Sequence, residues 1–171
     1  MQKYDREGED ICAVGLRPAT LEDKPFLRQL FATTRADELA LMPWDDNQKE
    51  TFIAMQFNAQ NQQYAMSYPQ VDHNIILFWG APIGRMMVAR NDATISLVDI
   101  ALLPEFRNVG IGTGLIQDLL NEAAAVGKPV RLHVFASSAA MRLYERLGFS
   151  RIGLDTAYLE MIWVPPVSRS C

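Results

Sequence analysis

Cysteine and histidine are scarce in this sequence, and their scarcity removes several classes of site. The 171 residues contain two cysteines, Cys12 and Cys171, and two histidines, His73 and His133. Neither pair has the spacing of a disulfide framework or of a metal site, so we expect no metal ligand set and a reducing compartment. The cysteines also lack the sequence context of an activated nucleophile.

Long apolar runs and an excess of positive charge are also absent. No stretch approaches the ~18 consecutive apolar residues that a membrane span needs, and the charged first residues, MQKYDREGED, do not resemble a secretory signal. The formal net charge of −4 has the wrong sign for a nucleic-acid-binding surface. We therefore expect a cytoplasmic protein without a nucleic-acid or membrane partner.

The apolar content of the chain is sufficient for one well-buried domain. Apolar residues make up 49% of the sequence, and the chain is too short for two comfortable domains. No repeat, low-complexity tract or linker divides it. We expect a single domain over residues 1–171, with an ordered core of about residues 11–164.

The apolar residues change period along the chain, which predicts alternating strands and helices. Thr20, with Asp23 three residues later, predicts a capping box at a helix start, and Asp45 or Asp46 predicts the cap of a second helix that ends near Met66. The first helix is expected to bury one stripe, consisting of Leu21, Phe26, Leu27, Leu30 and Phe31. The other expected elements are a strand at 13–17, three antiparallel strands within 74–103, a helix that Gly127 ends, a strand at 130–135, a helix at 137–147 and a strand at 157–164. This order predicts a mixed α/β layer fold.

Four small or turn-forming residues lie between a strand-like run and the helix that Gly127 ends: Asn108, Gly110, Gly112 and Gly114. Glycine lowers helix stability, so their presence indicates that a ligand needs close access to the backbone. Free N–H groups and the helix dipole form an anion site at such a helix start. Asn108 tolerates left-handed backbone angles, and Arg107 adds a cationic fork. The arrangement predicts a pyrophosphate ligand.

Two other phosphate-binding motifs fail on particular residues. A P-loop needs Gly-Lys-Ser/Thr, and no lysine follows Gly112 or Gly114. A dinucleotide fingerprint needs a third glycine where Leu115 stands, and the strand VRLHVF lacks an acidic end. Tight helix–strand packing without a ligand is the remaining alternative.

Arg107-Asn108-Val109-Gly110-Ile111-Gly112 is similar to the R/Q-x-x-G-x-G/A signature of the GCN5-related N-acetyltransferase (GNAT) superfamily. LVDIALLPEFR resembles that superfamily's fourth strand and its exit, and RLHVFASSAAMRLYERLGF resembles its fifth strand, the helix that follows and the Leu-Tyr-x-x-x-Gly-Phe motif. The resemblance covers roughly residues 13–163. It implies an α/β (mixed α+β) GNAT fold, with a central, mostly antiparallel sheet of six to seven strands, a splayed fourth and fifth strand, and flanking helices.

The resemblance also implies acetyl-CoA (coenzyme A) as the cofactor and assigns its contacts. Backbone groups of Ile100, Ala101 and Leu102 would hold the pantetheine amide and the thioester oxygen. The pyrophosphate cradle would consist of Arg107, Asn108, Val109, Gly110, Ile111, Gly112 and Thr113. Ser137 stands where many members carry an asparagine that contacts the pantetheine arm, and its hydroxyl would replace part of that contact. Arg142 and Arg146 would either reach the 3′-phosphate or form a solvated basic face.

Acetyl transfer to an amine needs a deprotonated amine, donors for the tetrahedral oxyanion and a donor for the departing thiolate. In the superfamily the transfer is direct, without an acyl-enzyme.

Tyr144 falls on the motif tyrosine and would protonate or hydrogen-bond the leaving sulfur; otherwise it is a packed aromatic residue. Asp99 interrupts an apolar strand and would take the amine proton through water, bind a cationic substrate or cap a neighbouring strand. His133, expected to point away from the face of its neighbours, is a second base to consider, and His73 is expected in a loop.

The acceptor would be read by the least patterned segments: residues 38–48, the second helix with Met55 and Phe57, and the turn from Asp155 to Tyr158. Trp44 and the acids that follow it are compatible with a hydrophobic amine, although such residues are also common in cores. We expect a small-molecule amine acceptor. The alternatives are a protein N-terminus, as in the ribosomal-protein branch, and a non-catalytic acyl-CoA-binding module. The resemblance also allows a homodimer.

Overall fold

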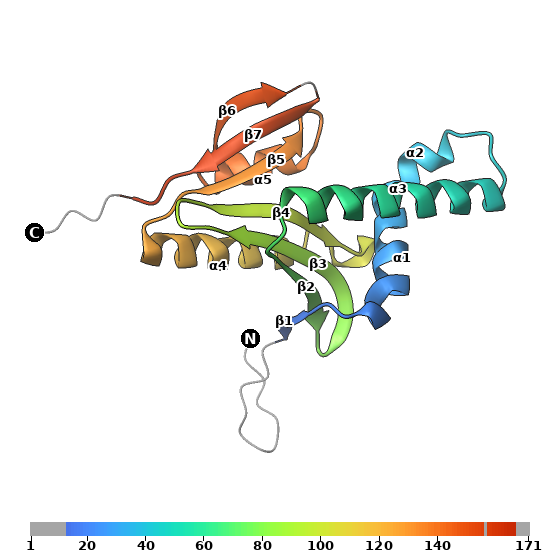
Figure 1. The fold of residues 1–171 in the computed structure, drawn as a ribbon, viewed down its shortest axis with the longest axis horizontal. Coiled ribbons are helices and arrows are strands. Elements are labelled where there is room, and N and C mark those ends of the chain that lie inside the picture. Colours follow the sequence, from blue (N-terminus) through green and yellow to red (C-terminus); the bar gives the residue numbers. More distant parts are fainter. Residues whose placement is uncertain (1–12, 156, 167–171) are drawn as a thin grey trace, which may run out of the picture. The chain divides into compact units, whose positions relative to one another are not determined.

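Strands and helices alternate in a computed structural model that describes residues 13–155 and 157–166 (Figure 1). The strands are β1 (Val14–Pro18), β2 (Val71–Phe78), β3 (Ala81–Arg90), β4 (Ile95–Leu102), β5 (Val130–Phe135), β6 (Ser150–Asp155) and β7 (Tyr158–Trp163). The helices are α1 (Lys24–Thr34), α2 (Ala36–Ala40), α3 (Asp46–Ser67), α4 (Ile111–Val126) and α5 (Ala140–Arg146), with 3₁₀ helices η1 (Leu21–Asp23) and η2 (Pro104–Phe106). The predicted elements are confirmed, while α2 and β6 are additional to them.

The strands form one sheet in the order β1-β2-β3-β4-β5-β7-β6. β1 and β2 are antiparallel, with Val14 opposite Phe78, and β7 pairs antiparallel with both β5 and β6. β4 and β5 form a parallel pair, joined through α4. The prediction of a mixed, mostly antiparallel sheet with helices between its strands is confirmed.

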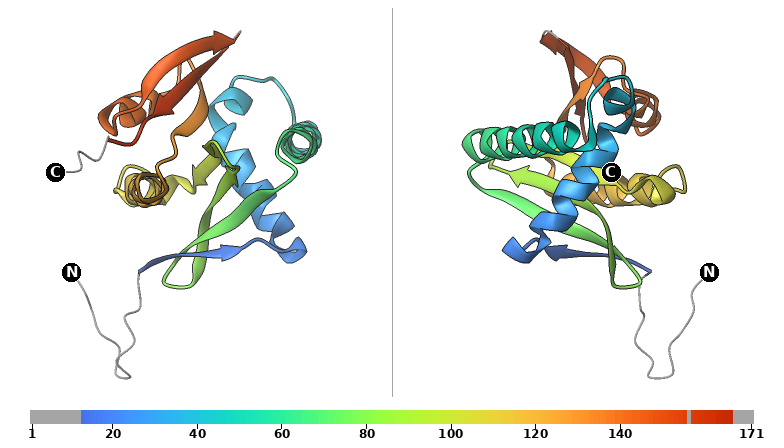
Figure 2. Two further views of the ribbon diagram at one scale, coloured as in Figure 1. Left: turned by 60° about the vertical axis from the view of Figure 1, so that its left-hand side comes forward. Right: turned by 90° about the vertical axis from the view of Figure 1, so that its right-hand side faces the viewer.

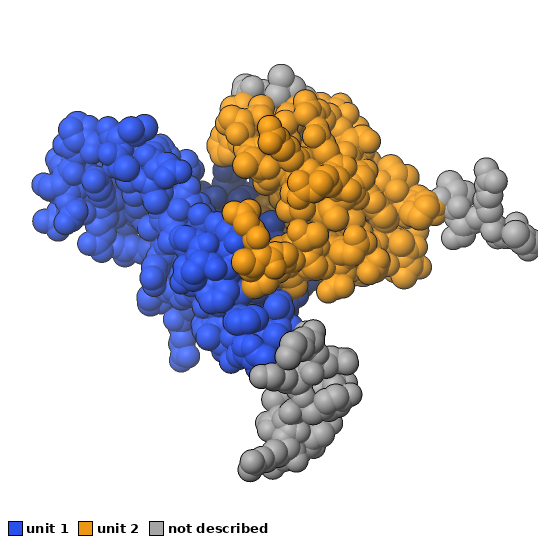
Figure 3. Space-filling model, turned by 180° about the vertical axis from the view of Figure 1, so that it is seen from behind, with its two compact units in different colours: residues 1–86, 100–107 blue, residues 87–99, 108–171 orange. Residues whose placement is uncertain are grey.

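Two compact units divide the described chain (Figure 3). The first contains the residues up to Met86 together with Ile100–Arg107, and the second contains Met87–Asp99 and the residues from Asn108 on. The expectation of one domain over residues 1–171 stays a prediction. Cys12 and Cys171 lie outside the described residues.

The core of the first unit lies where α1, α3 and β2 meet. Its buried cluster consists of Leu27, Phe31, Ile53, Phe57 and Ile75, and each such side chain contributes about 1.5–3 kcal/mol of burial free energy. Figure 2 shows α1 packed across α3. Leu21 was expected in the buried stripe but is 94% exposed, because it lies in η1, before α1 begins. Among the described helices, none is long and apolar enough to cross a bilayer.

In the second unit, α4 and β5 each direct one apolar face inward. The buried residues are Ile116, Leu119, Leu120 and Ala123 of α4 and Val130, Leu132 and Val134 of β5. Gly127 ends α4 in a left-handed conformation, with φ of 66°, as its position after the apolar stripe predicts. Because these apolar residues of α4 are buried, its polar face is exposed to solvent. The same packing fixes the position of the helix and so of its start at Gly110.

Candidate functional site

β4 and β5 pair in parallel where both strands begin, within the second unit. The parallel register runs from Ile95 opposite Val130 to Leu97 opposite Leu132, although β4 continues to Leu102. β5 instead continues its pairing with β7, as far as Phe135 opposite Tyr158. The parallel pairing of these two strands is confirmed, whereas their splay and the free backbone groups it would leave on the C-terminal part of β4 stay predictions.

The C-terminal end of β4 is held closely against β3 in the first unit. Leu103 N–H donates to Ile83 O at 2.8 Å. A Cβ at Gly84 would lie 2.3 Å from Ala101 O and 2.9 Å from the Leu102 Cδ2 atom, which no other residue tolerates without a backbone shift. Gly84 therefore fixes the position of the segment predicted to bind pantetheine. The sequence reasoning missed it, because its only local signal is a glycine within an apolar strand.

The turn before α4 adopts the left-handed conformation that its residues predict. Asn108 has φ of 59° and Gly110 has φ of 92°. Gly110 is the N-cap of α4 and has no side chain that could bind the N–H groups of the first turn. The first hydrogen bond of the helix runs from Gly114 N–H to Gly110 O, at 2.9 Å. Ideal Cβ atoms at Gly110 and Gly114 would meet nothing within 4 Å. The helix start thus combines first-turn N–H groups, a positive dipole end and open space.

Arg107 directs its guanidinium group to other parts of the first unit. Its Nε donates to Leu102 O at 2.8 Å, and its Nη2 donates to Thr33 Oγ1 at 2.9 Å. Thr33 Oγ1 in turn donates to Leu30 O at 2.7 Å. The side chain therefore links the end of β4 and the η2 loop to α1. Its predicted role as a cationic fork for the pyrophosphate stays a prediction, and the observed contacts add a structural role.

Tyr144 lies on α5 and is 8% exposed. Its ring packs edge-on against Phe149, with 5.7 Å between ring centroids. α5 ends at Arg146, and Gly148 follows with a φ of 94°, which other residues rarely adopt, and a Cβ position 3.3 Å from Trp163 Cδ1. Phe149 N–H then donates to Tyr144 O at 3.0 Å. The Leu-Tyr-x-x-x-Gly-Phe motif therefore holds the tyrosine ring in one orientation.

The environment of Tyr144 keeps its hydroxyl protonated. Burial is the main cause, and the negative charge of Asp99 is the second; together they raise the pKa of Tyr144 to about 12, from an ordinary value near 10. Asp99 is half-buried in β4. Two residues singled out separately in the sequence, 45 positions apart, thus act on one another within the second unit.

The remaining predicted residues lie at the surface or in strands. His133 is exposed on the face of β5 opposite to Leu132 and Val134, as predicted, and lies opposite Glu160 in the register with β7. His73 lies within β2 and not in a loop, and its carbonyl accepts a hydrogen bond from Ala19 N–H at 2.9 Å. The loop prediction for His73 is therefore wrong, since β2 begins at Val71.

The turn after β5 carries Ser137, which is exposed. Its neighbour Ser138 accepts a hydrogen bond from Ala140 N–H at 3.2 Å and so supports the start of α5. Arg142 and Arg146 are exposed on α5. Their 3′-phosphate contact stays a prediction, as does the pantetheine contact of Ser137. In the described part of the chain, no three His, Cys, Asp or Glu residues are grouped to hold a metal ion.

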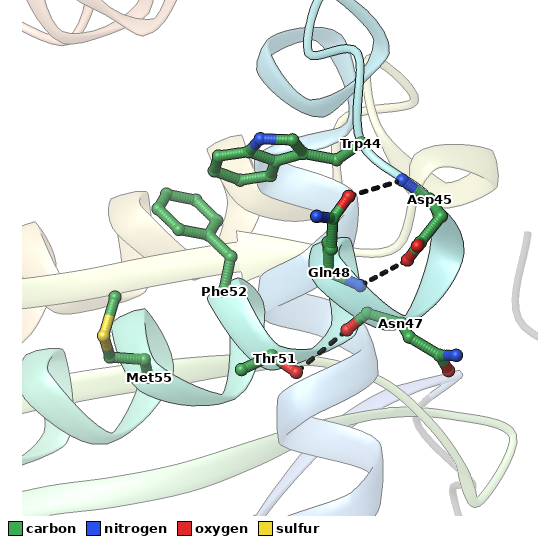
Figure 4. A pocket seen from close by; sticks show the side chains of 7 residues that line it. All are labelled: Trp44, Asp45, Asn47, Gln48, Thr51, Phe52 and Met55. Atoms are coloured by element: carbon green, nitrogen blue, oxygen red, sulfur yellow. Dashed lines mark hydrogen bonds between the residues drawn. The ribbon is translucent and has the colours of Figure 1, made fainter.

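A surface cavity of about 490 Å³ lies at the start of α3 (Figure 4). It is lined by Trp44, Asp45, Asn47, Gln48, Thr51, Phe52 and Met55. Most of these residues belong to the segments from which acceptor recognition was expected. Phe57, named in the same prediction, is instead 2% exposed and belongs to the core.

Comparison with known proteins identifies relatives for most of this architecture. Residues 27–149 match the model of the acetyltransferase (GNAT) family. A stretch of 62 residues is 44% identical to the mouse and human cysteine-rich protein 2-binding protein. That stretch makes up 36% of this chain and 7% of the length of each of those relatives.

Solved structures share the fold at low sequence identity. The PaiA N-acetyltransferase from Thermoplasma acidophilum, in complex with coenzyme A, superposes with a TM-score of 0.67 at 16% identity, over 90% of this chain and 99% of that one. The ribosomal-protein-S18-alanine N-acetyltransferase from Escherichia coli superposes with a TM-score of 0.56 at 22% identity, over 92% and 96%. At these identities the superpositions establish the fold.

Proposed function

The chain belongs to the acetyltransferase (GNAT) family, and from this premise we propose that it transfers an acetyl group from acetyl-CoA directly to the primary amine of a small-molecule acceptor. The observation that carries the proposal is the left-handed turn at Asn108 and Gly110, which precedes a helix start without a side-chain cap. Backbone N–H groups in this arrangement bind phosphate groups. The coenzyme A complex of the T. acidophilum relative supports the same cofactor.

The residues present fit two parts of the cofactor, the pyrophosphate and the pantetheine arm. The N–H groups of Ile111, Gly112 and Thr113 would bind the pyrophosphate, and the open space over Gly110 and Gly114 leaves room for it. Backbone groups of the segment from Ile100 to Leu102 would bind pantetheine, because this segment resembles the end of the fourth strand that holds pantetheine in the family. Bound acetyl-CoA supplies the acyl group as a thioester.

Tyr144 would act as a hydrogen-bond donor to the departing sulfur. With a pKa of about 12, its hydroxyl holds its proton throughout the physiological pH range. A thiol has a pKa of about 8.5, so complete proton transfer from Tyr144 to a thiolate is uphill by about 3.5 pKa units, or about 5 kcal/mol. A hydrogen bond that strengthens as negative charge develops on sulfur has no such cost. We therefore favour stabilisation of the thiolate over its full protonation.

Asp99 would act on the acceptor amine. Its carboxylate is half-buried and close enough to Tyr144 to affect the pKa of that residue. A carboxylate in this position would attract and orient the acceptor's ammonium group, and the amine's proton would pass on to solvent water before the amine attacks. His133 is the less favoured base, because its side chain is exposed.

The test is thiol release from acetyl-CoA, followed across a panel of primary amines with the purified protein. We expect amine-dependent release of coenzyme A and an acetylated product of the corresponding mass. Binding of acetyl-CoA without turnover on any amine or peptide would contradict the enzymatic proposal and favour the non-catalytic acyl-CoA-binding module.

A protein N-terminus is the second acceptor to consider. The superposition on the E. coli ribosomal-protein-S18-alanine N-acetyltransferase, at 22% identity, favours including it. Short peptides with a free N-terminus belong in the same panel. Activity on these peptides and none on free amines would replace the small-molecule proposal with this one.

A further inference from the structure

The cavity at the start of α3 has an apolar wall and a polar edge (Figure 4). The wall consists of Trp44, Phe52 and Met55. The rings of Trp44 and Phe52 meet edge to face, with 5.2 Å between centroids and 62° between planes, and Met55 is 58% exposed. These residues lie in the segments expected to recognise the acceptor, and none is assigned to the cofactor.

The polar edge of the cavity is held by the cap of α3. Gln48 N–H donates to Asp45 Oδ1 at 2.8 Å, and Asp45 N–H donates to Gln48 Oε1 at 3.0 Å. Thr51 Oγ1 donates to Asn47 O at 2.9 Å. Next to Phe52, Ile53 is buried in the core at 5% exposure, which fixes the orientation of the helix. The cavity is thus preformed, and a ligand would lose little free energy in ordering it.

The charges around the cavity favour a cation. Asp45 is an exposed carboxylate that lines the cavity, and Asp46 is the next residue along α3, whereas Glu50 is already paired with Arg28. Lys49 is the cation of the same turn. An ammonium group is attracted both to a carboxylate and to the face of an indole ring. Asp45 at the polar edge and Trp44 in the apolar wall therefore both favour a positively charged ligand.

We propose that this Trp44 cavity binds an organic ammonium ion that carries an aromatic or branched alkyl group. The apolar group packs on Trp44, Phe52 and Met55, and the ammonium group interacts with Asp45. The proposal rests on the proposed function and names the class of acceptor amine. It predicts binding in the absence of acetyl-CoA, so a failure of binding and a failure of turnover are told apart.

The experiment is a titration followed by NMR of the tryptophan indole N–H groups, with 2-phenylethylammonium as the probe. We expect a saturable shift of the Trp44 resonance, while Trp79 and Trp163 serve as controls in the same spectrum. The uncharged 2-phenylethanol should bind about threefold more weakly, and anionic 3-phenylpropanoate about tenfold more weakly. Equal shifts of all three indoles, or equal affinity for the anion, would overturn the proposal.

Two matched variants on α3 provide a second test. Met55→Lys places a positive charge in the cavity at an exposed position and should weaken 2-phenylethylammonium binding at least about tenfold. Met66→Lys makes the same change at a residue that is 82% exposed and outside the cavity lining, and it should leave the affinity unchanged. Circular dichroism checks that both variants fold. Unchanged affinity in a folded Met55→Lys variant sinks the proposal.

Discussion

At the scale of single residues, the hydroxyl of Tyr144 is the group on which the proposed chemistry most depends. Tyr144→Phe keeps the ring that packs on Phe149 and removes only the donor. We expect kcat to fall about 10- to 100-fold, because the lost hydrogen bond acts on charge that develops at sulfur. The Kd for coenzyme A should stay within about twofold, as measured by calorimetry. An active enzyme whose kcat is unchanged by the substitution removes Tyr144 from the chemistry.

Asp99 offers an independent residue-scale prediction. Its negative charge disfavours ionisation of Tyr144, so Asp99→Asn should lower the pKa of Tyr144 from about 12. The pKa should remain above 10, because burial is the larger cause. The measurement is a pH titration by NMR with ¹³Cζ-labelled tyrosine, using Tyr144→Phe to assign the signal. A pKa that stays the same or rises contradicts the placement of these two side chains.

At the scale of elements, the contact between β3 and β4 is the least tolerant feature of the proposed site. Gly84→Ala would place a Cβ against Ala101 O, where the space is 2.3 Å. We expect a loss of unfolding free energy of about 2–3 kcal/mol in urea. Because β4 must shift, coenzyme A affinity should fall as well. Gly114→Ala, whose Cβ meets nothing within 4 Å, is the stability control; equal stability of the two variants would contradict the close approach.

The elements also show how far local sequence could predict the structure. The end of α4 follows from Gly127, because a left-handed glycine commonly follows the last turn of a helix, and its start follows from the glycines that come after the apolar strand. β6 was missed, since its pairing with β7 shifts between Arg151 and Gly153, which interrupts the alternation that identifies a strand. α2 was missed because five residues carry too little periodicity to identify a helix.

The proposed site also contains some features that local sequence predicts and others that it does not. The left-handed turn from Asn108 to Gly110 is contiguous in sequence, and its residues report a local backbone requirement, so its conformation could be predicted, while its pyrophosphate contact stays a prediction. The bond from Arg107 to Thr33 spans 74 positions, and the contact of Gly84 with Ala101 joins two strands. No local pattern carries such information, because tertiary packing brings these residues together.

At the scale of the whole molecule, stability should depend on pH through Asp23. Arg17 donates to both carboxylate oxygens at 2.7 Å, and Thr20 N–H donates to Oδ2 at the same distance. These bonds hold the pKa of Asp23 well below its usual range. The unfolded value is about 3.9, so the stabilisation is complete above that pH and is lost as the pH falls below it.

The Asp23→Asn variant tests this dependence. We expect it to unfold more easily at pH 7 by about 1–2 kcal/mol, after allowance for the solvent exposure of Arg17. Urea denaturation at several pH values should show the difference between the two proteins narrowing below pH of about 4. Arg28→Gln, which removes an exposed ion pair with Glu50, is the control with little effect. A difference that is the same at pH 3 and pH 7 would show that the ionised carboxylate is not its source.

Calorimetric titration of coenzyme A and of pantetheine into the same protein tests the central claim, that the start of α4 binds a pyrophosphate. We predict one coenzyme A per chain, bound at least about 100-fold more tightly than pantetheine, which lacks the pyrophosphate together with the 3′-phosphoadenosine attached to it. Gly112→Asp, which adds a carboxylate favourable to a helix N-terminus but repulsive to phosphate, should remove that advantage and keep the fold. No binding of coenzyme A, or equal binding of pantetheine, would contradict the account.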